Sequence, residues 1–392
     1  MKTSTRCVHP EGTDDPYCAV APPIYQTATF RQPGATEFGE YDYTRTANPT
    51  RRMVENQLAQ LEGGSFACAF ASGMAAITAV TKLVEWGDEI IAGDDLYGGT
   101  VRLLDQVLPR QGVNVVYADT TDVEDVARCI SPRTKLMLIE TPTNPQMHIT
   151  DIRALAGLAR EAGVILAVDN SMLSPVLQQP LALGADLVIH SATKYLCGHS
   201  DVTGGGVVTN DEALHRRLAF QQNAEGGGLS PFDAWLLLRG IKTLSLRVER
   251  QNATAQKVAR FLAAQPAVAR VYYAGLPTHP GYEIHRRQAT GAGAVISFTT
   301  GDAEFSQAFV EATQLFDIAV SFGSVNSTIS LPCRMSHASI PAALRDKLAP
   351  PSDLIRLSVG IEDVDDLMAD LDQAFAMAAA KTSGELVTAA CH

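Results

Sequence analysis

The chain of 392 residues is long enough for one large domain and a smaller one, or for two domains of comparable size. Hydrophobic residues make up 46% of it, which provides for a sizeable core and excludes an intrinsically disordered protein. A formal net charge of −12 argues against nucleic acid and against an anionic membrane surface as the main partner.

The first 48 residues differ in pattern from those that follow. They are rich in Pro, Thr and Tyr and show little periodicity, so we expect residues 1–48 to form an extended N-terminal arm. An Asn-Pro start, apolar residues three to four apart and a glycine stop then predict a helix within residues 48–63. A short buried strand is expected in residues 66–72, and a helix opens directly after it in residues 73–84.

Short apolar runs alternate with helical patterns over the next part of the chain. This alternation predicts βαβ units, and therefore an α/β fold with a largely parallel sheet that is buried on both faces. In such sheets, ligands bind at the carboxyl ends of the strands. The expected strands lie in residues 88–94, 113–119, 135–141, 164–170, 185–191 and 204–209.

The C-terminal part of the chain also alternates strands with helices. Its expected elements are a leading helical stretch over residues 230–265, strands in 294–300 and 355–360, and a last helix near 364–380. We therefore predict three parts, which are the arm (1–48), a large ligand-binding domain (49–247) and a C-terminal domain (248–392).

The cysteines and the hydropathy pattern indicate a cellular location. Seven cysteines are scattered without a C-x-x-C pair, which is typical of reduced thiols rather than of a disulfide framework or a zinc site. The N-terminal residues contain no apolar core of signal-peptide length, and no run approaches the roughly 18 apolar residues that a membrane helix requires. We therefore expect a cytoplasmic protein without membrane contact.

The stretch SATKYLCGHSDVTGG, residues 191–205, places a lysine directly after a buried strand. Lys194 alone would most simply be a surface lysine, but two hydroxyl residues and a glycine-rich loop flank it. Asp169 ends another apolar strand at the same edge of the sheet, although a carboxylate there could be only a helix cap. A lysine and an aspartate on neighbouring strand ends are what a pyridoxal phosphate site requires. The lysine forms a Schiff base with the cofactor, and the carboxylate keeps the pyridine nitrogen protonated.

A phosphate group needs its own binding site, and the turn at Ser72, Gly73 and Met74 is suited to it. A strand passes into a helix there, where unpaired N–H groups and the helix dipole favour an anion. A Ser-Gly turn before a helix is also a common cap, so this motif is weak alone. Ser191 and Thr193 could add hydroxyl donors to the same phosphate.

Competing motifs are absent from the sequence. There is no G-x-x-x-x-G-K-[ST], no G-x-S-x-G, and no G-x-G-x-x-G after a strand. The glycines of residues 291–296 lack the third member and precede a strand, so a dinucleotide site is not indicated. His190 and His199 have no third ligand in view, so we interpret both as structural and expect no metal site.

Several motifs, in order and across nearly the whole chain, resemble those of the Cys/Met-metabolism enzymes that use pyridoxal phosphate. SATKYLCGHSDVTGG is similar to the cofactor-lysine signature of that family. The resemblance implies pyridoxal-phosphate fold type I, the aspartate-aminotransferase-like α/β fold, and pyridoxal 5′-phosphate as cofactor. The other matching motifs are PPIYQTATF, YDYTRTANPTR, ASGMAAI, LYGGT, ETPTNP, VDNS and LSVGIEDVDDL.

The resemblance implies the cofactor contacts residue by residue. Lys194 would be the Schiff-base lysine, Asp169 would partner the pyridine nitrogen, and Tyr97 would stack on the ring. Tyr43 and Arg45 resemble residues that reach into the neighbouring subunit's phosphate site, which implies a dimer with shared active sites. The family commonly forms homotetramers built from two such dimers. The residues that would hold the phosphate are Gly73, Met74, Ser191 and Thr193.

Three further residues match substrate contacts of the family. Arg356 resembles the arginine that binds the α-carboxylate of an amino-acid substrate, and a planar bidentate donor suits that role. A snorkelling residue at a sheet edge is the alternative interpretation. Asn144 and Ser321 match secondary contacts to the ring and the substrate. The expected partner is therefore a small amino acid.

Residues 222–249 and 318–341 most resemble the plant-type β-lyase branch of the family. The resemblance implies β-elimination from cystathionine, which releases homocysteine, pyruvate and ammonia. Gly99 stands where methionine γ-lyases usually carry a cysteine. Val320 stands where cystathionine γ-lyases and γ-synthases usually carry a glutamate.

In this reaction Lys194 would be the general base that removes the Cα proton, a role typically worth about 10²–10⁴ in rate. Either Lys194 or Tyr97 would donate the proton to the leaving thiolate. The alternatives are γ-elimination or γ-synthase activity on cystathionine, methionine γ-lyase-like activity, and β-elimination from another cysteine conjugate. A catalytically silent protein that only binds the cofactor is a further alternative, against which the intact set of Lys194, Asp169 and Arg356 argues.

Overall fold

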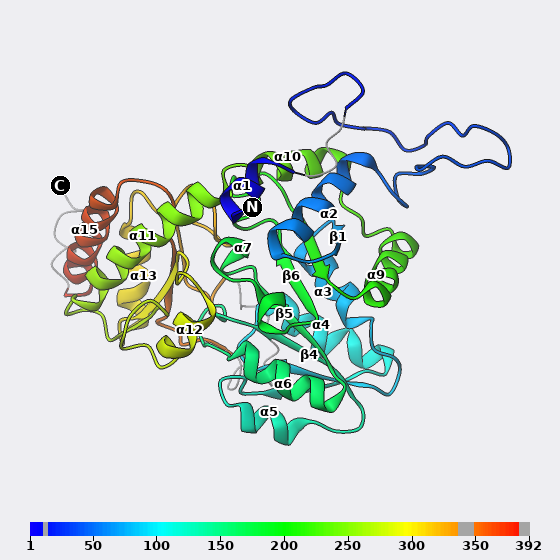
Figure 1. Cartoon of the computed structure of the whole chain (residues 1–392). Coiled ribbons are helices and arrows are strands. Elements are labelled where there is room, and N and C mark those ends of the chain that lie inside the picture. The colour runs from blue at the N-terminus through cyan, green and yellow to red at the C-terminus, as the bar shows by residue number, and fades with distance from the viewer. Residues whose placement is uncertain (11–14, 336–348, 384–392) are drawn as a thin grey trace.

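The computed structural model describes residues 1–10, 15–335 and 349–383. Two sheets lie side by side in Figure 1, each with helices packed around it. The larger sheet has seven strands in the order β1-β7-β6-β5-β4-β2-β3. These strands are β1 (Phe66–Phe70), β2 (Glu89–Gly93), β3 (Asn114–Ala118), β4 (Thr134–Glu140), β5 (Ile165–Asp169), β6 (Leu187–Ser191) and β7 (Gly205–Thr209).

The larger sheet confirms the predicted strands and their largely parallel arrangement. Strands β3, β2, β4, β5 and β6 pair in parallel, and β7 is antiparallel to both of its neighbours. Alternate side chains of a strand enter different cores, as the pleat requires. Ile90 packs with residues of α3 and α4, whereas Ile91 packs with residues of α5 and α6. Both faces of the sheet are therefore buried.

Local signals set the boundaries of the first long helix. The Asn48 side chain accepts a hydrogen bond from the backbone N–H of Thr50, Pro49 occupies the first turn, and Gly63 ends the helix at φ +71°. The helices of the larger sheet are α2 (Pro49–Glu62), α3 (Gly73–Thr81), α4 (Gly98–Gln106), α5 (Val123–Cys129), α6 (Ile152–Ala162), α7 (Ser174–Leu177), α8 (Pro180–Leu183), α9 (Glu212–Glu225) and a 3₁₀ turn at Leu108–Gln111.

The smaller sheet has five strands in the order β10-β11-β12-β9-β8, which pair antiparallel except for β10 with β11. Its strands are β8 (Arg270–Tyr272), β9 (Val295–Thr299), β10 (Asp317–Ile318), β11 (Thr328–Ser330) and β12 (Ile355–Ser358). The helical stretch that leads into it is divided in two, since α10 ends at Ile241 and α11 begins at Leu244. The helices are α10 (Pro231–Ile241), α11 (Leu244–Ala263), α12 (Tyr282–Gln288), α13 (Ala303–Ala312) and α15 (Val364–Thr382).

The N-terminal segment is only partly extended. Residues 15–48 contain no helix or strand and project from the body of the molecule in dark blue (Figure 1). Thr3–Val8 instead forms helix α1, which the sequence pattern did not predict. Cys7 is buried, and the Gln57 side chain donates to the carbonyl of Arg6 at 2.7 Å, so packing against α2 stabilises this short helix. The boundaries at residues 48 and 247 remain predictions.

Within residues 1–10, 15–335 and 349–383, none of the helices combines the length and the apolar character needed to cross a bilayer.

Candidate active site

One cavity of about 580 Å³ is lined by the carboxyl ends of β4, β5 and β6, the start of α3, and β12. Because β4, β5 and β6 are parallel, their carboxyl ends meet at one edge of the sheet, as the sequence predicts. The predicted site residues that line the cavity are Ser72, Gly73, Met74, Tyr97, Asn144, Asp169, Ser191, Thr193, Lys194, Ser321 and Arg356. The other lining residues are Ile77, Arg102, Glu140, Ser171, Thr203, Val320, Phe322 and Met335.

Lys194 follows β6 and points its ammonium group into this cavity. Its Nζ donates to Ser321 Oγ at 2.6 Å and lies 5.0 Å from the centre of the Phe322 ring. Burial, followed by the nearby Arg356 guanidinium, lowers the pKa of Lys194 to about 8, against the opposing influence of Asp169 and Glu140. A substantial fraction of the amine is therefore neutral near pH 7–8, which is the form that acts as a nucleophile or base.

Asp169 is the last residue of β5. Burial raises the pKa of its carboxyl, while hydrogen bonds from Ser171 and the nearby His190 and Lys194 oppose that increase. Behind Asp169, His190 Nε2 lies 2.6 Å from Glu62 Oε1, and both side chains are almost completely buried. This pair agrees with the structural role expected for His190. Asp169 is thus a buried acid with a hydrogen-bonded pair of His190 and Glu62 nearby.

The start of α3 forms a close-fitting backbone turn at the cavity wall. Ser72 caps the helix, because its Oγ accepts the N–H of Ala75 at 3.0 Å. A Cβ atom at Gly73 would lie 2.8 Å from Ser191 Cβ, so only glycine lets the helix start approach β6 this closely. The first N–H groups of a helix have no intrahelical acceptor, and they carry the positive end of its dipole. The turn therefore presents anion-binding groups beside the Ser191 and Thr193 hydroxyls.

Arg356 lies in β12 with only 3% of its surface exposed. Its guanidinium donates to Asn144 Oδ1 and to the carbonyl of Ser321, both at 2.8 Å. Burial lowers the pKa of Arg356 to about 10. Among the residues that the structure describes, no carboxylate forms an ion pair with it. A buried cation of this kind, held in place by neutral oxygens, is suited to bind the carboxylate of a small ligand.

Ser321 connects the two cationic groups of the cavity. Its hydroxyl accepts from Lys194, and its carbonyl accepts from Arg356. The backbone of Ser321 has φ +80°, a left-handed conformation that non-glycine residues rarely adopt. Such residues cluster at functional sites, where the surrounding contacts hold them in place.

Tyr97 lies at the mouth of the cavity, immediately before α4, with 41% of its surface exposed. Its ring folds back over Gly99, where a Cβ atom would lie only 2.4 Å from Tyr97 Cε1. Glycine at position 99 therefore allows the ring to take this orientation.

Of the lining residues that the sequence analysis did not single out, Glu140 and Phe322 have the most direct contacts with the predicted site residues. Glu140 belongs to the ETPTNP motif, and its position at the end of β4, beside a strand that ends in Asp169, is a signal that could have identified it. Phe322 lies under both cations, with the Arg356 Cζ 5.8 Å from its ring centre. The contacts of Phe322 with these two cations form only when the two sheets pack together, so the sequence around Phe322 does not predict them.

The structure does not bring Tyr43 and Arg45 to the cavity of their own chain. The Arg45 guanidinium donates to the carbonyl of Asn223 at 2.6 Å and lies 5.6 Å from the Tyr43 ring centre. Both residues lie at the base of the projecting arm, beside the start of α10. Their predicted contact with a neighbouring subunit therefore stays a prediction.

Comparison with known proteins identifies the family. Residues 4–376 match the family model described as Cys/Met metabolism PLP-dependent enzyme. The chain belongs to this family. It is therefore an enzyme of cysteine and methionine metabolism that depends on pyridoxal phosphate, as the sequence motifs predict.

Individual members of this family are similar to nearly the whole of this chain. Cystathionine beta-lyase, chloroplastic, of Arabidopsis thaliana is 55% identical over 372 residues, which cover 95% of this chain and 80% of that protein. Cystathionine gamma-lyase of Bacillus subtilis (strain 168) is 50% identical over 375 residues, covering 95% and 99%. A solved structure of cystathionine gamma-lyase from Lactobacillus plantarum, complexed with L-serine, aligns with a TM-score of 0.94 at 45% identity and covers 97% of this chain and all of that one.

The cavity fits the cofactor of the Cys/Met-metabolism family on its own geometry. The glycine-lined turn at the start of α3 suits the phosphate, and the buried carboxyl of Asp169 suits a protonated ring nitrogen. The Lys194 amine, with its lowered pKa, suits the aldehyde. The fold is that of pyridoxal-phosphate fold type I, as the structural comparison shows.

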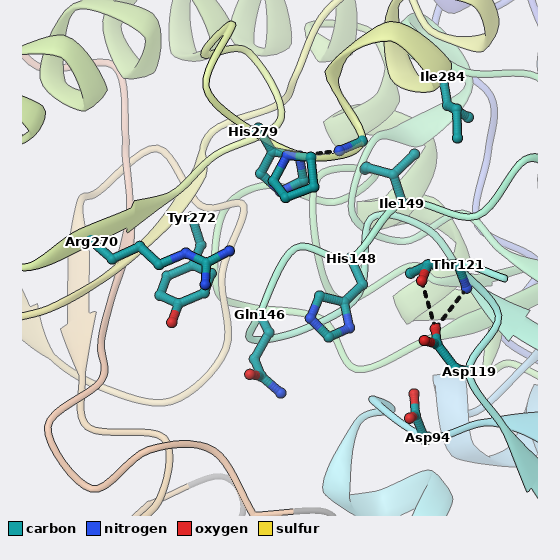
Figure 2. Close-up of a pocket in the computed structure, with 12 residues that line it drawn as sticks. Asp94, Asp119, Thr121, Gln146, His148, Ile149, Arg270, Tyr272, His279 and Ile284 are labelled. Carbon is teal, nitrogen blue, oxygen red and sulfur yellow. Dashed lines mark hydrogen bonds between the residues drawn. The ribbon is translucent and has the colours of Figure 1, made fainter.

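A second cavity of about 420 Å³ lies between the ends of β2 and β3 and the segment from β8 to α12. Figure 2 shows Arg270 and Tyr272 on one side of it and Asp94 and Asp119 on the other. None of the predicted site residues lines this cavity. The candidate active site is therefore the first cavity, where the predicted residues gather.

Proposed function

We propose that the chain cleaves the Cβ–S bond of cystathionine and releases homocysteine, pyruvate and ammonia, with one water consumed. The observation that carries this proposal is the apolar side chain of Val320, which lines the cavity directly before Ser321 and Phe322. The similarity to a plant cystathionine beta-lyase supports it, and the similarity to a bacterial cystathionine gamma-lyase defines the main alternative.

Cystathionine has an amino-acid group at each end, so its orientation decides which C–S bond is cleaved. Arg356 would bind the α-carboxylate of the reacting end. The other end then carries an ammonium group, which an acidic residue beside Ser321 would attract. Val320 offers that ammonium only apolar contact, so the charge contact that we propose to favour the γ orientation is missing.

When bound, pyridoxal phosphate supplies an electron sink for the negative charge that develops at Cα. We propose that Gly73, Met74, Ser191 and Thr193 would hold its phosphate, and Asp169 its ring nitrogen. Tyr97 would lie against the ring, and Asn144 would contact the ring from the Arg356 side.

Lys194 is the proposed base that takes the Cα proton. Its amine is neutral in a useful fraction near pH 7–8, because burial and Arg356 lower its pKa to about 8. The Ser321 hydroxyl, 2.6 Å from Nζ, holds the amine at the wall of the cavity that also carries Arg356. The proton for the leaving thiolate would come from Lys194 or from Tyr97, whose ring lies at the cavity mouth.

The test is a single digest of cystathionine in which both keto acids and both thiols are measured. We expect pyruvate and homocysteine as the main products, with 2-oxobutyrate and cysteine as minor ones. Val320→Glu should shift the ratio towards the γ products, whereas the neutral isostere Val320→Gln should shift it less. Predominance of 2-oxobutyrate from the unmodified protein would replace the β-lyase proposal with γ-lyase activity.

The proposed assembly is a homotetramer built from two dimers with shared active sites. Arg45 lies outside the cavity of its own chain, with its guanidinium on the carbonyl of Asn223, and we propose that it contacts the phosphate site of a neighbouring subunit instead. Mixing Arg45→Ala with Lys194→Ala protein should restore part of the activity after subunit exchange. A lack of restored activity despite proven exchange would mean that Arg45 acts within its own subunit.

We also propose a cytoplasmic location, which cell fractionation tests.

A further inference from the structure

Glu140 is an acid of the active-site cavity to which neither the motifs nor the proposed mechanism assigns a role. It is the last residue of β4 and pairs in register with Asp169 on β5. Only 6% of its surface is exposed, and its side chain lines the cavity. Two carboxyl groups thus stand side by side at the edge of the sheet where the cofactor is expected.

The contacts of Glu140 join two segments that carry site residues. Its Oε2 accepts the backbone N–H of Tyr97 at 3.4 Å. The backbone N–H of Asn144 lies near enough to stabilise the charged form of the same carboxyl. The Asn144 side chain in turn accepts from Arg356 at 2.8 Å. The buried carboxyl of Glu140 therefore lies between the backbone of Tyr97 and the turn at Asn144. The Asn144 side chain in turn orients Arg356.

We propose that Glu140 is a positioning residue, whose carboxyl ties the backbone of Tyr97 to that of Asn144 and so fixes the cofactor-facing ring and the Asn144–Arg356 pair together. This inference rests on the proposed function only in taking Tyr97 and Arg356 as contacts of cofactor and substrate. A tie of this kind needs hydrogen-bond acceptors at position 140, and it does not need a negative charge.

The electrostatic surroundings favour an uncharged Glu140. Burial, together with the charges of Asp169 and Asp95, raises the pKa of Glu140 well above its usual range. Asp169 keeps the charge more readily, since Ser171, His190 and Lys194 stabilise it. The charged or titratable groups that face Glu140 are Asp95, Tyr97, Asp169, Lys194 and Arg356.

Three substitutions distinguish a role for the hydrogen-bond acceptors of Glu140 from a role for its negative charge. Glu140→Gln keeps a carbonyl acceptor and the side-chain length, so we expect cofactor affinity and KM within about 3-fold of the unmodified holoenzyme. Glu140→Ala removes the acceptor that faces the backbone N–H groups of Tyr97 and Asn144, and we expect KM and the cofactor dissociation constant to rise roughly 10- to 30-fold. Glu140→Asp shortens the side chain by one methylene and should lie between the two, which keeps the test informative if the alanine variant does not fold.

Glu89→Ala is the matched control. Glu89 is also a buried acid with 5% exposure, but it lies at the opposite end of the sheet, where it accepts the hydroxyls of Ser131 and Thr134. Its loss should lower thermal stability without changing KM or the cofactor signal. A purely structural role for Glu140 would give the same result as this control.

The readouts are the visible circular dichroism of the bound cofactor, its dissociation constant, KM and the pH profile of kcat. We expect Glu140→Ala to change the dichroism and KM. Glu140→Gln should leave the acid limb of the profile in place, which is the limb that the protonation of Lys194 sets. Unchanged dichroism, cofactor affinity and KM in Glu140→Ala would overturn the proposal. So would a Glu140→Gln variant as impaired as Glu140→Ala, with its acid limb moved to lower pH because a negative charge near Lys194 had been lost. The identity of the keto acid tests the proposed function separately, because these readouts hold for either product.

Discussion

Replacing Gly99 by alanine should loosen the cofactor without loosening the fold. The added Cβ atom would lie 2.4 Å from Tyr97 Cε1 and 3.1 Å from Met74 Sδ. No real Cβ contact is as short as the first of these, so the tyrosine ring must swing away. Tyr97 is 41% exposed at the cavity mouth, and the ring therefore has solvent into which to move.

The size of the effect follows from the contact that is lost. A well-placed aromatic pair contributes about 0.5–1.5 kcal/mol beyond its buried area, so a displaced Tyr97 should weaken pyridoxal phosphate binding roughly 2- to 13-fold. The apoprotein should be as stable as before or slightly more so, since alanine in a helix is favoured over glycine by up to about 1 kcal/mol.

The assay compares cofactor dissociation by equilibrium dialysis with urea unfolding of the apoprotein. Gly157→Ala is the matched control, because Gly157 lies in helix α6 and its added Cβ atom would meet nothing within 4 Å. It should share any gain in stability and leave cofactor binding unchanged. If Gly99→Ala binds the cofactor as tightly as the unmodified protein, with the same dichroism, the proposed role of the Tyr97 ring is wrong.

Two further predictions concern groups whose protonation or burial the structure defines. The rate at which the apoprotein takes up pyridoxal phosphate should rise about tenfold per pH unit below pH 8 and level off above it, because only the neutral amine reacts and the pKa of Lys194 is lowered to about 8. Stopped-flow absorbance measures this rate. A rate that continues to rise up to about pH 10 would indicate a lysine with an ordinary pKa. Glu62→Ala should lower the free energy of unfolding by about 3–5 kcal/mol, since it breaks a buried pair with His190. The exposed pair of Lys82 and Glu225 supplies the control, because Glu225→Ala should cost at most about 1 kcal/mol, and equal costs in urea unfolding would contradict this reasoning.

Local chemistry explains why much of the fold could be predicted from the sequence. Asn48, Pro49 and Gly63 act on their own helix within a few residues, so their effect does not depend on the rest of the chain. The position of Lys194 near Asp169 also follows from local pattern, because parallel strands bring their carboxyl ends to one edge. Helix α1 was missed since Thr3–Val8 has no strong signal of its own and depends on packing against α2.

The sequence by itself determined the α/β class, the family and the cofactor, because each is encoded in short motifs whose residues act within one turn or strand end. Only the tertiary structure decided which groups share the cavity with those motifs. Lys194 contacts Ser321 across 127 residues of sequence, and Arg356 contacts Asn144 across 212. The lowered pKa of Lys194 and the tie made by Glu140 depend on burial and on charges brought close by distant elements. Those quantities arise when the two sheets pack together, and no local pattern contains them.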